Sequence, residues 1–86
     1  MNTADIVSSY AESDRTRRLH ISRGDNAFQL VQSKQGYGMV VITDESQNEE
    51  IERYYALDMA IEDVAERLQV PVGAIEVPEA AQTMGI

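Results

Sequence analysis

The chain holds few residues of the types that carry acid–base or nucleophilic chemistry. His20 is the only histidine, and there is no cysteine. Thiol catalysis, disulfides and thiolate metal sites are therefore excluded. A serine–histidine–acid triad would need Ser22 or a distant serine in a fixed relation to His20, and no motif places one there. The sequence predicts a protein without catalysis.

Carboxylates are the other group that could do chemistry, because neighbouring acids on a helix can share a metal ion. Two such groups occur, Glu49, Glu50 and Glu52 in one and Glu62, Asp63 and Glu66 in the other. No histidine joins either group, so a solvated acidic helix face is the favoured interpretation. Glycine-rich phosphate loops are absent, since QGYG at 35–38 is too short and precedes a strand. We expect no metal and no cofactor.

Charge is distributed unevenly along the chain. The net charge is −8 overall, but residues 15–34 carry +4 while residues 44–79 carry −9. Such segments are ordinarily solvated faces that partly neutralise each other across the fold. The functional alternative is a basic strand surface that meets an acidic partner, such as the acidic helix of a second copy. Arg18, His20 and Arg23 are the expected contacts.

The overall acidity favours basic partners over nucleic acid. A second interpretation is a halophilic source, because Lys34 is the only lysine beside six arginines and fifteen acids. In a salt-rich cytoplasm the acidity would describe the solvent rather than a partner. The sequence opens without a signal-peptide pattern and has no apolar run near the roughly 18–20 residues that cross a bilayer. We expect a cytoplasmic protein.

The elements that would position these residues form a single α+β domain over 1–86. A first helix is expected within residues 1–17, since Ile6, Val7, Tyr10 and Ala11 form one helical stripe. Alternating runs at 18–23, 27–34 and 37–44, separated by the turns GDNA and QGYG, predict a three-stranded antiparallel meander over 18–44.

A long C-terminal amphipathic helix is predicted over 46–69. Ser46 and Glu49 form a capping-box pattern, and apolar residues follow at helical spacing. Pro71 ends the helix near Gln69. Residues 70–86 form an extended tail in which VGAIEV could make a short final strand. Helices on one face of a small sheet would give a two-layer sandwich.

Two resemblances bear on nucleic-acid binding. Residues 64–79, VAERLQVPVGAIEVPE, resemble the front half of helix-turn-helix motifs at Ala65, Leu68, Val70 and Ile75. The reading helix would carry Glu76 and Glu79 and would break at Pro78, so it would repel phosphates. The predicted order of elements is also similar to that of double-stranded RNA-binding domains. Their basic residues at the start of the last helix are replaced here by SQNEEIE.

The third predicted strand leads to the functional prediction. It is apolar on both faces, with Met39 and Val41 on one and Val40 and Ile42 on the other. An apolar strand at a sheet edge invites pairing. We therefore expect a homodimer that acts as a protein–protein interaction or regulatory module, with Val40, Ile42 and Tyr55 at the interface.

Two alternatives to this prediction stay open. The C-terminal IEV segment could cover the edge within one chain. The second function considered is a nucleic-acid-associated regulator that uses Arg17, Arg18 and Arg23 of the basic first strand. The sequence gives no specific biological role.

Overall fold

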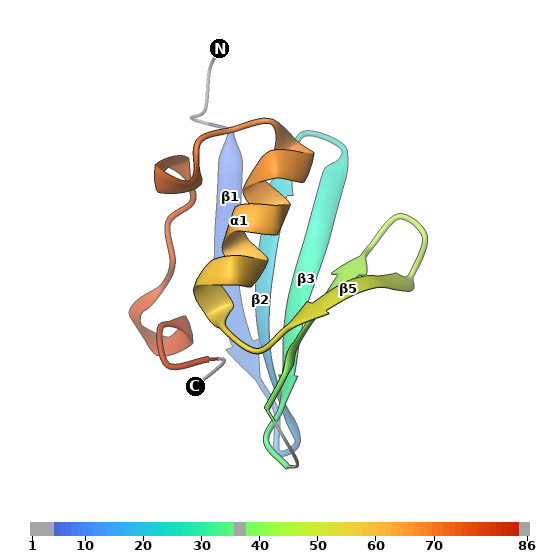
Figure 1. The fold of residues 1–86 in the computed structure, drawn as a ribbon, viewed down its shortest axis with the longest axis vertical. Coiled ribbons are helices and arrows are strands. Elements are labelled where there is room, and N and C mark those ends of the chain that lie inside the picture. Colours follow the sequence, from blue (N-terminus) through green and yellow to red (C-terminus); the bar gives the residue numbers. More distant parts are fainter. Residues whose placement is uncertain (1–4, 36–37, 85–86) are drawn as a thin grey trace.

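The described part of the chain forms a five-stranded antiparallel sheet with one α-helix against it, and Figure 1 shows this arrangement. The computed structural model describes residues 5–35 and 38–84. Its strands lie side by side in chain order: β1 (Ile6–Glu12), β2 (Thr16–Arg23), β3 (Asn26–Ser33), β4 (Val40–Asp44) and β5 (Glu49–Tyr54). The helix α1 (Leu57–Leu68) follows, and the tail after it holds two 3₁₀ turns, η1 (Val72–Ala74) and η2 (Glu79–Ala81).

The predicted first helix over 1–17 is wrong. Residues 6–12 form β1, which pairs with β2 over seven consecutive positions. The stripe that indicated a helix was short, and Ile6, Val7 and Tyr10 are also good strand formers. An isolated helix of about a dozen residues is marginal in water, so pairing with β2 determines the outcome.

The three predicted strands overlap β2, β3 and β4, with the third beginning at Val40 rather than at residue 37, but they are not the whole sheet. The GDNA turn holds, with Gly24 in the left-handed region at φ +59°, a conformation that suits glycine. Gly36 and Tyr37 of the QGYG turn lie outside the described residues. The three-stranded meander is therefore corrected to a five-stranded one.

The first half of the predicted helix over 46–69 is also wrong. Asp44 accepts hydrogen bonds from the backbone N–H and the hydroxyl of Ser46, at 2.9 and 2.7 Å. These bonds make a turn rather than a capping box. Residues 49–54 then return as β5 with a bulge opposite Ile42 and Thr43. Only residues 57–68 are helical.

Between residues 69 and 84 the chain forms neither a second α-helix nor a final strand. Gln69 ends α1 in the left-handed conformation (φ 59°), and Val70 N–H bonds the Ala65 carbonyl at 3.0 Å, a common way to end a helix. As far as the tail is described, it contains only the turns η1 and η2. The helix-turn-helix resemblance therefore has no reading helix. The resemblance to RNA-binding domains also fails, because the first element of the described residues is the strand β1.

The core lies between one face of the sheet and α1. Buried apolar side chains come from alternate positions of three strands and from the inner side of the helix: Leu19, Ile21, Phe28, Leu30, Val40, Ile42, Leu57, Ala60, Ile61, Val64, Ala65 and Leu68. The tail adds Val70, Ile75, Ala81 and Met84. The tail and α1 therefore share the same side of the sheet, and no described element forms a layer on the other face.

Tyr54 and Asp63 join the end of β5 to α1. The Tyr54 hydroxyl donates a 2.5 Å hydrogen bond to Asp63, which also accepts a bond from Arg67 Nε one helical turn later. The hydrogen bond to Asp63 raises the pKa of Tyr54 to about 12. The hydrogen bond that joins β5 to α1 therefore depends on a protonated Tyr54 hydroxyl.

We expect the folded state to lose stability as the pH rises from about 10 to 12. A pKa that is higher in the folded state than in the unfolded chain stabilises the protein fully below the unfolded value and progressively less above it. Urea unfolding at pH 8 and at pH 11.5 measures this loss. Tyr54→Phe should be less stable at pH 8 and should show a smaller loss between the two values. An equal loss in both proteins would show that Tyr54 does not carry the effect.

Candidate interaction surface

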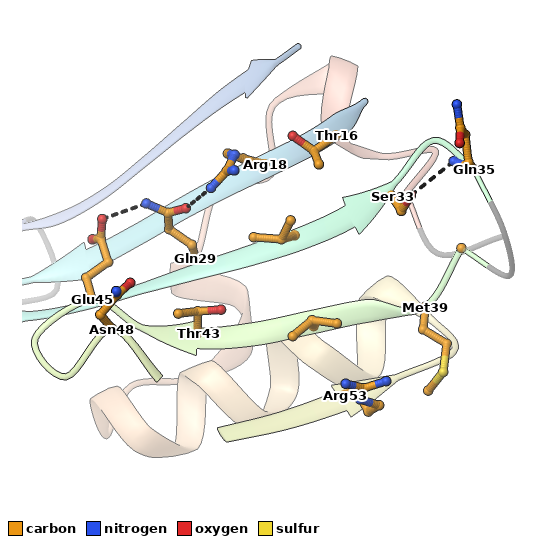
Figure 2. A pocket seen from close by; sticks show the side chains of 13 residues that line it. Thr16, Arg18, Gln29, Ser33, Gln35, Met39, Thr43, Glu45, Asn48 and Arg53 are labelled. Carbon is orange, nitrogen blue, oxygen red and sulfur yellow. Dashed lines mark hydrogen bonds between the residues drawn. The ribbon is translucent and has the colours of Figure 1, made fainter. Parts of the chain in front are cut away.

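The face of the sheet opposite α1 is open, and we call it the open face. It is formed by the side chains of β1 to β5 that alternate with those facing the core. A shallow hollow of about 700 Å³ lies over it, lined among others by Arg18, Gln29, Val31, Val41 and Arg53. Figure 2 shows these strands and the side chains on them. Val31 and Val41 are both half-buried and form an apolar centre.

The strand register orders this face into rows. One row runs across the sheet through Arg18, Val31, Val41 and Arg53, which are partners in successive strand pairs. The next row holds His20, Gln29, Thr43 and Glu50. The apolar centre is thus flanked by an arginine on β2 and another on β5.

Hydrogen bonds connect the polar side chains of β2 and β3 with the start of the turn after β4. Arg18 Nη1 donates to Gln29 Oε1 at 3.0 Å, and Gln29 Nε2 donates to Glu45 Oε1 at 2.8 Å. Glu45 Oε2 also lies 3.1 Å from His20 Nδ1. Figure 2 shows the links through Gln29 as dashed lines. This network fixes where the Arg18 guanidinium lies.

The two arginines of the face differ in their partners. Arg53 makes two hydrogen bonds to Glu50, at 2.8 and 2.6 Å. Arg18 has no carboxylate within 4.0 Å in the described part of the chain. An arginine held only by a neutral amide keeps donors free for an acidic group from another molecule.

The structure separates the basic residues that the sequence grouped together. Arg18 and His20 share the open face, but Arg17 and Arg23 lie on the core side of the sheet. Arg23 donates to the Leu68 carbonyl at 2.7 Å and so caps the end of α1. Arg17 donates to the Ala80 carbonyl at 2.7 Å and so holds the tail. Because side chains alternate along a strand, Arg17 and Arg18 must point to opposite faces.

The positions predicted for the interface residues Val40, Ile42 and Tyr55 also need correction. Val40 and Ile42 are fully buried beneath α1, with exposed fractions of 0%. The outward positions of β4 are Val41 and Thr43. Tyr55 is exposed (74%) but precedes α1 rather than lying on it. The prediction that this strand is apolar on both faces is correct. Because both faces are apolar, the sequence does not indicate which of them α1 covers.

Sequence reasoning missed most of the open face. Val31 lies beside Val41 only because β3 and β4 pair in this register. Glu45 was assigned no role from the sequence, whereas in the structure its carboxylate lies 3.1 Å from His20 Nδ1. The alternation of Gln29, Val31 and Ser33 along β3 was a usable signal, since residues two apart share a face.

The described residues hold neither a metal-ligand cluster nor a membrane-spanning helix. Among residues 5–35 and 38–84, no three histidine, aspartate or glutamate side chains gather closely enough to hold a metal ion. Within the same residues, no helix has the length and apolar character needed to cross a membrane.

The fold and the open face together define a small α+β protein. In its described residues, α1 and the tail cover one face of a five-stranded meander and leave the other face open. The whole chain, residues 1–86, matches DUF7111, a family of unknown function, and the protein belongs to this family. Neither the comparison with curated proteins nor that with solved structures found a match.

Proposed function

We propose that the protein is a non-catalytic protein–protein interaction module that acts as a homodimer and self-associates through its sheet. The observation that carries the proposal is the incomplete cover of that sheet in the described part of the chain. α1 and the tail bury the core face, while edge strand β1 hydrogen-bonds with β2 on one side only and keeps Val7 57% exposed. A second copy of the same chain is available wherever the protein is present, so it is the partner that we propose.

The nucleic-acid alternative has less support. It relied on Arg17, Arg18 and Arg23 acting together, and two of these three side chains are engaged on the core side. Arg18 alone stays on the open face, in a chain with a net charge of −8. Because phosphate contacts supply most of the affinity for nucleic acid, a single free arginine is a weak basis for it.

Light scattering at several salt concentrations tests the homodimer. We expect a mass of about twice 9.6 kDa, with a larger dimeric fraction in 1 M than in 0.1 M NaCl. Two copies of charge −8 repel each other, and salt shortens the range of that repulsion from about 10 Å to about 3 Å. A mass of one chain at all salt and protein concentrations would contradict the proposal.

A further inference from the structure

The outer side of β1 is a sheet edge that the described part of the chain leaves unpaired. β1 hydrogen-bonds with β2 on one side only. The tail runs alongside β1 (Figure 1), and the Ser8 hydroxyl donates to the Glu76 carbonyl. No backbone–backbone hydrogen bond among the described residues joins β1 to the tail. The tail therefore packs alongside β1 without completing its ladder.

The hairpin between β1 and β2 shows which backbone groups face outward. Ser13 N–H donates to the Thr16 carbonyl at 2.8 Å, so these two residues form a directly bonded pair. Bonded and non-bonded pairs alternate along an antiparallel ladder. The alternation assigns the N–H and C=O groups of Ile6, Ser8, Tyr10 and Glu12 to the free side of β1.

The two edges of the sheet differ in what they offer to another strand. β5 carries charges at four of its six positions and is interrupted by a bulge. Charges and bulges are the usual devices that block strand addition. β1 has neither a bulge nor a proline, and its only charged residue, Glu12, is its last. Val7 on this strand is 57% exposed.

We infer that β1 pairs with β1 of a second copy, antiparallel and about a two-fold axis at Ser9, to give a continuous ten-stranded sheet. This inference rests on the proposed homodimer and names its contact. The four outward-facing residues of each copy would each donate and accept one backbone bond. Val7 of each copy would lie opposite the partner's Ala11, a small apolar residue, on the open face.

The charged residues near the ends of β1 are compatible with this pairing. Glu12 lies 3.5 Å from Lys34, and Asp5 lies 3.8 Å from Arg23. Both acids are therefore partly neutralised within their own chain. The hydrogen bond from Tyr10 and the charge of Lys34 also lower the pKa of Glu12, so it stays ionised beside its lysine.

The difference between the edges also limits the size of the assembly. Each copy has one edge open to strand addition, and a two-fold contact uses the open edge of both copies. The contact is then closed, and it yields a dimer rather than a fibre.

Charge substitutions at Ser9 test the inference. Ser9 is exposed on the open face, and two copies of residue 9 would face each other with Cβ atoms about 4.5–5.5 Å apart. We expect Ser9→Lys alone and Ser9→Glu alone to be monomeric by light scattering, because like charges oppose each other. An equimolar mixture of the two should recover the mass of a dimer. Ser33→Lys, at an exposed position of inner strand β3, is the matched control and should stay dimeric.

The outcomes separate the inference from the proposed function. If the wild type is dimeric and Ser9→Lys and Ser9→Glu are equally dimeric, the β1 contact is wrong although the homodimer stands. A mixture that stays monomeric would contradict the two-fold at Ser9. A monomeric wild type would contradict both proposals. Recovery of a dimer in the mixture also shows that the single variants are folded.

Discussion

Val40→Glu should abolish the folded state. Val40 is fully buried between β4 and α1, so the variant would place a carboxylate in the apolar core. Burying a charge without a partner costs several kcal/mol, even when the carboxylate takes up a proton. A domain of this size has a total stability of only about 5–15 kcal/mol. We expect loss of the far-ultraviolet circular dichroism of the native protein and of chemical-shift dispersion at 25 °C.

Val41→Glu is the matched control for this experiment. It makes the same substitution one residue later, on the open face, where Val41 is half-buried. We expect a folded variant that unfolds cooperatively and remains dimeric, because β1 and not β4 makes the contact. A folded Val40→Glu beside an unfolded Val41→Glu would show that the two faces of β4 have been exchanged.

The sequence alone leads to a different expected outcome for Val40→Glu. From the sequence alone, Val40→Glu would give a monomer with unchanged circular dichroism, because Val40 was assigned to an interface. Alternation identifies which residues of a strand share a face, but it does not say which face meets a helix. Where both faces are apolar, as in β4, only the packed structure decides.

The central strands could be predicted because their signal is local. β2 and β3 alternate clearly, and Gly24 and Asp25 between them form a typical two-residue turn. The outer strands could not be predicted in the same way. β1 contains a short stripe compatible with a helix, and β5 joins directly to a helical pattern through Ile51 and Tyr54. In both, pairing with a neighbouring strand outweighs the local pattern.

The residues of the open face could be predicted only in part, because contacts between strands bring them together and the sequence does not show those contacts. Arg18 and His20 could be grouped from their spacing of two, and the structure keeps them together. Arg23 has odd spacing from them, and its position on the core side follows from the same alternation rule. The partners Gln29 and Glu45 come from other elements, so only the register between strands brings them to Arg18.

Amide hydrogen exchange along β1 separates a paired edge from a free one at single residues. The N–H groups of Val7, Ser9 and Ala11 face β2, so they should be protected in either case. Those of Ile6, Ser8 and Tyr10 face outward and are protected only if another strand accepts their hydrogen bonds. Protection factors range from near unity at frayed edges up to the value set by global unfolding.

The contact between two copies along β1 is the central claim, and exchange at Ser8 and Tyr10 tests it most directly. In the wild type at a concentration where the dimer predominates, both amides should exchange at least about 100-fold more slowly than in Ser9→Lys. The amides of Ser9 in the wild type and of Val7 in both proteins serve as internal controls. Fast exchange of Ser8 and Tyr10 in a dimeric wild type would contradict the claim.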